Sequence, residues 1–327
     1  MPRFIAGNLA KFVLLMAATS FVVFFLVSAS PVDPLSANVG QAALANLSDE
    51  RRVALEAHWG AGVPFWERYG AWMAGLVQGD LGTSLRFNAP VVDVIAQRAL
   101  NSCALMAIAW VASGILGFVL GVAAGARRGS KLDRAVKAYC FILAASPTFW
   151  VALIMLIVFS VGLGWFPIGF SQPIGRAAAD VTFLDALHHL ALPAFTLSLV
   201  GVANIALHTR EKTIDVMASP YVRFALARGE SKPSVILHHG LRNLALPAIT
   251  IQFAQVSEIF GGSVLVEQVF SYPGLGQAAV TAGIGGDAAL LAGIALVSAA
   301  IVFGGNLTAN VIYGLVDPQI RKGTHHA

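Results

Sequence analysis

The sequence predicts an all-α membrane protein with six transmembrane helices. Hydrophobic residues make up 57% of its 327 positions and charged residues 12%, too few charges to cover a water-soluble globule of this length. Six apolar runs are long enough to cross about 30 Å of hydrocarbon, which takes about 20 helical residues. Lysine and arginine also gather in alternate loops, a pattern that orients helices in a bilayer. Composition, segment length and charge therefore indicate one fold class.

The six predicted spans are 9–29, 99–126, 138–161, 186–209, 244–266 and 288–316. Arg3 and Lys11 precede an apolar stretch that ends in VSAS, as in a secretory signal, but this stretch is longer than a usual signal core and Pro31 follows it at once. We therefore expect it to remain as a span. Pro147 in the third run and Pro193 in the fourth are expected to break or kink their helices.

The charges orient the chain and divide it into segments. With the N-terminus in the cytoplasm, 15 of the 21 lysines and arginines, including all six lysines, lie inside. Both termini are then cytoplasmic. The predicted organisation is a cytoplasmic N-terminus with the first helix at 1–30, an extracytoplasmic segment at 31–98, a five-helix core at 99–316 that contains a cytoplasmic loop at 210–243, and a cytoplasmic tail at 317–327.

The external segment 31–98 carries two predicted amphipathic helices. Ser48 opens the first, with acidic residues in its first turn, and Pro64 opens the second. The segment is also rich in aromatic residues, which fit either a belt at the membrane interface or a docking surface for an external partner. These residues are Trp59, Phe65, Trp66, Tyr69 and Trp72.

Glycines recur every four residues in the second run, at 117, 121 and 125. A small-xxx-small pattern of this kind lets two helices approach closely within a membrane. We therefore expect this face to pack tightly against a neighbouring helix.

Several kinds of chemistry are excluded by motif. The chain contains no G-x-x-x-x-G-K-[ST] nucleotide loop and no H-E-x-x-H zinc motif, so it is expected to be no enzyme and to hold no cofactor of its own. Cys103 and Cys140 do not form a metal or disulfide framework. Asp185, His188 and His189 could share a helix face as metal ligands, but polarity at the membrane interface explains them more simply, and no metal site is predicted.

The polar stretch SPYVRFALARGESKPSVILHHGLRNLALP occupies 219–247. Ser219 and Pro220 are typical of a helix start and Gly229 of a left-handed helix end, which predicts a helix over 220–228. Ser231 and Pro233 indicate that a second short helix follows. In the first helix, the spacing places Tyr221, Phe224 and Ala225 on one face, continued by Arg228. A two-turn helix is marginal alone and needs a surface, which is lipid, its own spans or another protein.

Four stretches carry a resemblance to a known family. ALARGESKPSVILHHGLRNLALP, with its glycine at 229 and its Leu-Pro at 246–247, resembles the cytoplasmic EAA motif of ABC transporter permeases, in the version of the dipeptide/oligopeptide/nickel family. GDLGTSLRFNAPVVDVIAQRALNS, VEQVFSYPGLGQ and NLTANVIYGLVDPQIR are similar to other segments of that family. Leu226 and Arg228 replace its usual Arg and Lys, and Asn310 stands where it usually has Asp.

The resemblance implies the type I ABC importer permease fold, with an extracytoplasmic insertion between the first two helices, in the bacterial cytoplasmic (inner) membrane. It also implies a homologous second permease, two ATPase subunits that bind ATP and Mg²⁺, an extracytoplasmic substrate-binding protein and the lipid bilayer as partners, and no nucleic acid. In this family the loop helix couples the spans to an ATPase. The expected coupling residues are Tyr221, Arg223, Phe224, Ala225, Ala227, Arg228 and Gly229.

Two residues are candidates for the translocation path. Glu258 is the one carboxylate well inside a predicted span, where charge is costly, so it is expected to face the path and a cationic group of the cargo, or else to pair with Asn204, His208 or a partner subunit. Asn306 is the second path candidate.

The cargo and the energy source leave alternatives. The expected cargo is short peptides, with nickel chelates and glutathione as alternatives in the same family. A secondary transporter driven by an ion gradient is the alternative from another class. It would need titratable relays within the spans, for which a single glutamate is thin support.

Overall fold

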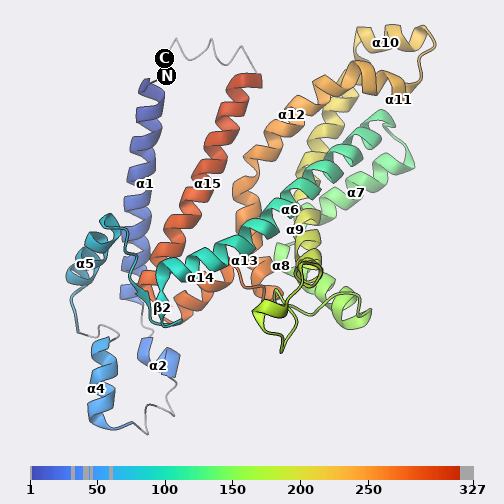
Figure 1. The fold of residues 1–327 in the computed structure, drawn as a ribbon. Helices are drawn as coiled ribbons and strands as arrows, with labels where there is room; N and C mark the ends of the chain where they lie inside the picture. The colour runs from blue at the N-terminus through green and yellow to red at the C-terminus, as the bar shows by residue number, and fades with distance from the viewer. Residues whose placement is uncertain (1, 31–33, 40–43, 45–46, 59–61, 317–327) are drawn as a thin grey trace. The chain divides into compact units, whose positions relative to one another are not determined.

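The computed structural model describes residues 2–30, 34–39, 44, 47–58 and 62–316, and the part of the chain that it describes is predominantly helical (Figure 1). The chain divides into two compact units, each built from more than one stretch of sequence. The first unit comprises 1–102 and 273–303, and the second comprises 103–272 and 304–327. Helices α6 (Val91–Ala126) and α15 (Ala288–Val316) contribute to both units.

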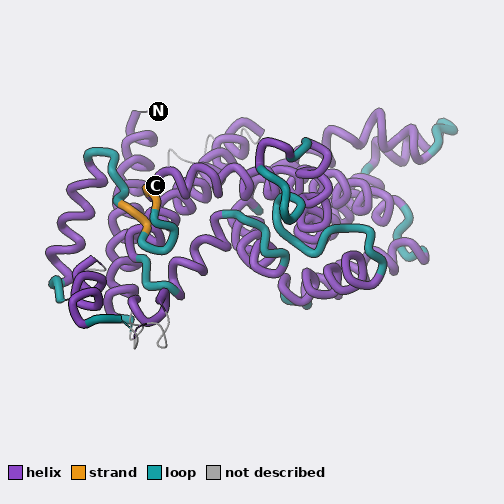
Figure 2. The backbone as a smooth tube through the Cα atoms, turned by 60° about the horizontal axis from the view of Figure 1, so that its bottom comes forward, coloured by secondary structure: helices purple, strands orange, loops and turns teal. Residues whose placement is uncertain are grey.

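The first unit holds one long helix, several short ones and a hairpin. Its elements are α1 (Pro2–Ala29), α2 (Pro34–Val39), α4 (Asp49–His58), α5 (Phe65–Val77), β1 (Thr83–Ser84), β2 (Ala89–Pro90), the start of α6, α14 (Leu275–Ile284) and the first part of α15. The two strands pair antiparallel and are drawn orange in Figure 2. Both helices predicted within 31–98 are present, as α4 after Ser48 and α5 after Pro64.

The aromatic residues of α5 pack on α1, which runs beside it in Figure 1. Tyr69 contacts the rings of Phe21 and Phe24 edge to face, and its hydroxyl lies 3.0 Å from the Ser20 hydroxyl. Trp72 is buried in the same cluster, and its indole donates to the Leu81 carbonyl. These side chains therefore fill a core between two helices. Trp59 lies outside the described residues.

A buried carboxylate holds the connection between α14 and α15 to the hairpin. Asp287 accepts from the Ser84 hydroxyl at 2.6 Å, from the Arg86 backbone N–H at 3.1 Å and from the N–H of Leu290 in the first turn of α15. Asp287 thus caps α15 and ties its start to the hairpin.

The second unit is a bundle around α9 (Phe183–Ala218). Its further elements are the second part of α6, α7 (Lys131–Ala145), α8 (Thr148–Met155) with a π-helical continuation (Leu156–Gly162), a 3₁₀ turn (Ala178–Asp180), α10 (Pro220–Ala227), α11 (Lys232–Val235), a π-helix (Ile236–Gly240), α12 (Leu241–Ala254) and α13 (Val256–Val269). Helices α7, α8, α12 and α13 all pack against α9.

The glycine face of α6 packs on α9, as the sequence predicts. A Cβ atom at Gly121 would lie 2.6 Å from the Ala206 carbonyl oxygen, and one at Gly125 would lie 2.6 Å from the carbonyl oxygen of Arg210. Real Cβ atoms do not approach other atoms so closely, so only glycine allows this separation of the two backbones.

The two prolines expected to disturb helices behave differently. Pro147 lies at a break where α7 and α8 meet at 110°, which confirms that expectation. A break at Pro193 is wrong, because the 36-residue helix α9 runs through it, whereas a kink there stays a prediction. Pro193 and Pro247 occur in the same local sequence, Ala-Leu-Pro-Ala-x-Thr, and in both helices the threonine hydroxyl donates to the carbonyl of the leucine before the proline. Close packing and local hydroxyls let both helices accommodate a proline.

Four described helices are long and apolar enough to cross a membrane, and six spans result if each of two bent helix pairs is one span. The four are Gly7–Ala29, Val91–Ala126, Phe183–Ala218 and Ala288–Ala309, and the bent pairs are Lys131–Gly162 and Lys232–Val269. The described chain is thus a helical protein with four to six candidate spans. The segment boundaries at 30, 98 and 316 stay predictions.

Candidate functional site

Helix α10 begins and ends at the residues that the sequence indicates. Ser219 has the extended backbone of an N-cap and Pro220 occupies the first helical position. The Ser219 hydroxyl, however, donates to the carbonyl of Val216 in α9, so it closes the preceding helix. At the other end, Gly229 has φ +89°, and the N–H groups of Gly229 and Glu230 bond the carbonyls of Leu226 and Ala225. This pair of bonds is a Schellman motif, which stops the helix sharply.

The inner face of α10 rests on the second unit. Val222 is fully buried and Ala225 is 5% exposed, and both pack with Val216 of α9, Val235 of α11 and Leu244 of α12. Of the three possible surfaces, which are lipid, the protein's own spans and another protein, the inner face of α10 therefore packs on the protein's own helices. The helix is held as part of that bundle.

The outer face of α10 is exposed. Tyr221 is 44% and Phe224 is 65% exposed, and Arg223, Ala227 and Arg228 are exposed beside them. The Arg228 guanidinium lies 6.0 Å from the centre of the Phe224 ring, within cation–π range. The Tyr221 hydroxyl accepts from the Asn243 side chain at 3.0 Å.

The expected coupling residues differ in burial, because one of them is buried and the others are exposed. The structure places Ala225 on the inner face, so the expectation that Tyr221, Phe224 and Ala225 share one face is wrong for Ala225, whose side chain follows the buried Val222. The sequence predicts the helix and its ends well, but the spacing of three and four residues leaves two adjacent faces open, and only packing on α9 decides between them.

The second short helix predicted after Ser231 is not separate. Helix α11 runs through the π-helix Ile236–Gly240 directly into α12, so a continuous helical path leads from Lys232 to Ala254 (Figure 1). Within it, His238 donates to the Ser234 carbonyl at 2.9 Å, and His239 lies 3.1 Å from the Glu230 carboxylate. The loop therefore consists of one short helix, α10, and of helical residues from Lys232 onward that lengthen the fifth predicted span at its start.

That span bends by 52° at Gln255, between α12 and α13. Gln255 is 5% exposed, and neither its amide nitrogen nor its amide oxygen has a partner among the described residues. Gln252, one turn earlier, donates from its amide nitrogen to the Trp110 carbonyl, while its buried amide oxygen is likewise unpartnered. Two glutamines three apart in an apolar run are a sequence signal that could have located this polar hinge.

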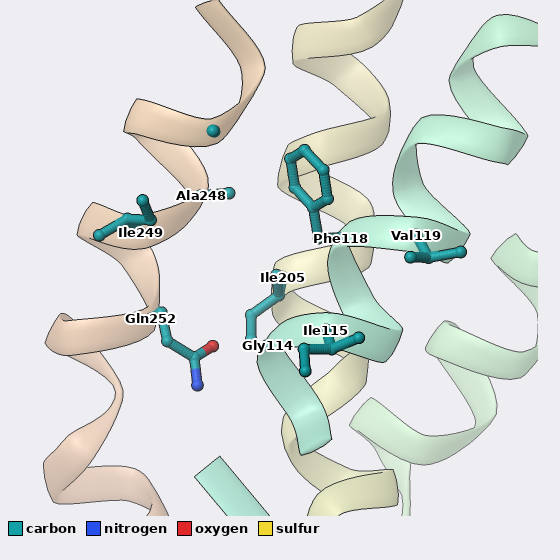
Figure 3. A pocket seen from close by; sticks show the side chains of 9 residues that line it. Gly114, Ile115, Phe118, Val119, Ile205, Ala248, Ile249 and Gln252 are labelled. Carbon is teal, nitrogen blue, oxygen red and sulfur yellow. The ribbon is translucent and has the colours of Figure 1, made fainter. Parts of the chain in front are cut away.

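An apolar groove of about 280 Å³ lies beside Gln252 (Figure 3). Side chains from α6, α9 and α12 line it, and Figure 3 shows Phe118, Ile205 and Ile249 around the opening. In a bilayer such a groove is readily filled by hydrocarbon, so its shape alone assigns it no ligand.

The two path candidates lie close together. Glu258 is exposed in the first turn of α13, and the hydroxyl of its neighbour Ser257 donates to Asn306 of α15 at 3.3 Å. Although Asn204 and His208 are both described, no hydrogen bond or ion pair joins either of them to Glu258. The side chain of Asn310 is outside the described residues.

Asp185, His188 and His189 each have their own partners. Asp185 forms a capping box with Thr182 at the start of α9 and an ion pair with Arg176 at 2.7 Å. His188 donates to the Trp165 carbonyl and His189 to the Gly169 carbonyl. Each of the three thus has a structural role, and within the described ranges no group of three such residues is arranged to hold a metal ion.

The described residues thus combine a bundle of apolar helices with a capped helix, α10, whose outer face is exposed, and with a polar bend at Gln255. The model of the binding-protein-dependent transport system inner membrane component family matches residues 117–322, and the chain belongs to this family.

Individual relatives match over nearly the whole chain. The oligopeptide transport system permease protein AppB of Bacillus subtilis (strain 168) is 35% identical over 91% of this chain and 92% of its own. The di/tripeptide transport system permease protein DppB of Pseudomonas aeruginosa (strain UCBPP-PA14) is 31% identical over 98% of this chain and 99% of its own. A putative peptide permease protein of Brucella suis biovar 1 (strain 1330) is 33% identical over 94% of this chain. The family resemblance stated from the motifs is confirmed.

Proposed function

We propose that this chain is one of two permease subunits of an ATP-driven importer of short peptides in a bacterial inner membrane. Six spans, with both termini in the cytoplasm and the segment 31–98 outside, fit the charge distribution and the two bent helix pairs. The peptide cargo is supported by the relatives named for oligopeptide and di/tripeptide transport. The partners are a homologous permease, two ATPases that bind ATP and Mg²⁺, and an external binding protein.

The observation that carries the proposal is the two-sided character of α10. Its inner face is anchored by Val222 and Ala225, whereas its outer face presents Tyr221, Phe224 and Arg228 to the solvent. Exposed aromatic and arginine side chains on a rigid support are well suited to a protein partner, because they give large contact area and pair with acidic groups. The outer face is therefore the surface on which an ATPase subunit docks.

Co-purification of the ATPase subunits with tagged variants of this chain tests the docking surface. Arg228→Glu reverses a charge on the outer face of α10, and Gly229→Pro removes the left-handed helix end, since proline cannot adopt a positive φ. Both variants are expected to reduce ATPase recovery at least about tenfold, a loss of about 1.4 kcal/mol. Arg128→Glu, the same charge change in the α6–α7 loop, is the control. Full ATPase recovery with both α10 variants would contradict docking through α10.

The path is the second part of the proposal. Glu258 and Asn306 line it, beside the hinge at Gln255 with its unpartnered amide groups. A bend between two helices, with buried polar atoms that have no hydrogen-bond partner among the described residues, is suited to a water-filled route, because irregular backbone in a membrane needs water or protein around it. Peptide backbones and termini offer donors and acceptors to such groups.

A further inference from the structure

Asp133 and Arg210 form a buried ion pair for which the family motifs assign no role. The Arg210 guanidinium donates to both carboxylate oxygens of Asp133, at 2.5 and 2.9 Å. Asp133 is 1% and Arg210 is 7% exposed. A bidentate pair of this kind fixes the relative orientation of the two side chains as well as their separation.

The pair joins two elements and a turn. Asp133 lies in the first turn of α7, where it also accepts from the Gly129 backbone N–H at 2.8 Å, while Ser130 caps the same helix. Arg210 lies on α9 and has a second partner in Glu211, an exposed carboxylate. The α6–α7 turn, the start of α7 and α9 are therefore tied together at one point.

The backbone of α9 is held at the same position from another side. Two glycines of α6 lie close to the main chain of Arg210. A Cβ atom at Gly121 would be 3.1 Å from the Arg210 backbone nitrogen, and a Cβ atom at Gly125 would be 2.6 Å from the Arg210 carbonyl oxygen. The glycines hold the Arg210 main chain and Asp133 holds its side chain. Helix α9 can neither slide nor rotate there without breaking one of these contacts.

Arg210 stands eight residues before the end of α9, about 12 Å along the helix axis. Helix α10 begins at Pro220 and packs on this last part of α9 through Val216 and Val222. A force applied to α10 therefore acts on the same end of α9 that α6 and α7 hold at Arg210, six residues before Val216.

We propose that Asp133 and Arg210 are positioning residues that make α9 and α10 move with α6 and α7 as one body, so that displacement of α10 is converted into movement of the spans. The inference rests on the proposed docking of an ATPase on α10. Without the pair, the end of α9 yields locally, and ATP hydrolysis continues with less transport.

The test uses the complete transporter with its binding protein in proteoliposomes, with peptide uptake and ATP hydrolysis measured in the same sample. The double variant Asp133→Asn with Arg210→Gln removes both charges together, which avoids leaving one buried charge unpaired. Arg210→Lys keeps the charge but loses the fork that binds both oxygens. Arg176→Met, which removes the exposed ion pair with Asp185, is the matched control.

The double variant and Arg210→Lys, which are the two clamp variants, are expected to keep ATPase subunits bound and ATP hydrolysis near the normal rate. The amount of peptide transported per ATP is expected to fall about fivefold or more, at the lower end of usual coupling factors. The control is expected to keep the normal ratio. An unchanged ratio in both clamp variants would overturn the proposal, and so would failure of both to assemble, which assigns the pair to folding alone. Failure of the docking proposal is separate, because it appears as unchanged ATPase recovery with Arg228→Glu.

Discussion

At the scale of single residues, the hinge region concentrates groups that a membrane interior does not favour. Gln255 has two buried amide atoms without partners among the described residues, and Glu258 follows within one turn. A charged side chain at the centre of a bilayer costs on the order of 2.5 to 3.5 kcal/mol on insertion scales. These polar groups are expected to be retained because the transported molecule or water contacts them.

Glu258→Gln tests the contact with cargo. The substitution keeps the size and removes the negative charge, so uptake of a peptide with a free amino terminus is expected to fall about tenfold, a loss of about 1.4 kcal/mol of interaction. Uptake of the same peptide with an acetylated terminus is expected to change little. Competition between the two peptides in one uptake assay measures the difference. Glu67→Gln in α5 provides a control with the same chemical change. Equal loss for both peptides would contradict recognition of the amine.

At the scale of elements, the contact of α6 with α9 decides how closely the bundle packs. Gly117, Gly121 and Gly125 each leave no room for a side chain, and each faces a different turn of α9. Contacts of this kind replace the hydrophobic effect as the source of helix association in lipid. The stability of the second unit is therefore expected to depend on glycine at these positions.

Gly121→Val is expected to destabilise the purified protein by about 1–3 kcal/mol, the usual range for overpacking. The new side chain meets the Ala206 carbonyl and the Thr209 Cβ atom, neither of which can move without shifting α9. Thermal unfolding in detergent measures the change, with the accessibility of the buried Cys140 thiol as the readout. Gly7→Ala in α1, where nothing lies within 4 Å of the added atom, should leave the midpoint unchanged or slightly raised. Equal midpoints for the two variants would show that the close approach adds nothing.

Local chemistry predicted the ends of several elements correctly. The end of α10 at Gly229, the break at Pro147, the starts of α4 and α5 and the close contact of the α6 glycines all follow from properties of the residues themselves. A positive φ such as that of Gly229 favours glycine, and a proline removes a helix donor. Such features need no knowledge of distant parts of the chain.

Features decided by tertiary packing were not predictable in this way. Pro193 remains within α9 because surrounding helices bury it, although its local preference is to end a helix. The helix passes through Gly240 as a π-helix, whereas the bend at Gln255 has neither glycine nor proline at the break. The burial of Ala225 and the pairing of Asp133 with Arg210 join residues that are distant or ambiguous in the sequence pattern.

At the scale of the whole molecule, the number of spans depends on the two bent helix pairs. If α7 and α8 together cross the membrane once, the segment after them lies on the side opposite to the start of α7. If the pair enters and leaves on one side, that segment returns to the side of Lys131. The 110° bend at Pro147 is compatible with either course, and the proposed six-span topology requires the first.

Labelling of single cysteines with a membrane-impermeant maleimide distinguishes these courses. The background carries Cys103→Ser and Cys140→Ala. In cells whose cytoplasmic membrane is intact and whose outer envelope has been removed, we expect two single cysteines to react: Val53→Cys in α4, and Ile174→Cys, a position after α8 that is 84% exposed. Ser231→Cys, between α10 and α11, is expected to react only after the membrane is permeabilised, because the proposed topology places it on the cytoplasmic side with the ATPase. Reaction at Ile174→Cys only after permeabilisation, with Val53→Cys already labelled, would show that α7 and α8 form a re-entrant pair. The proposed six-span topology would then be wrong at its third span.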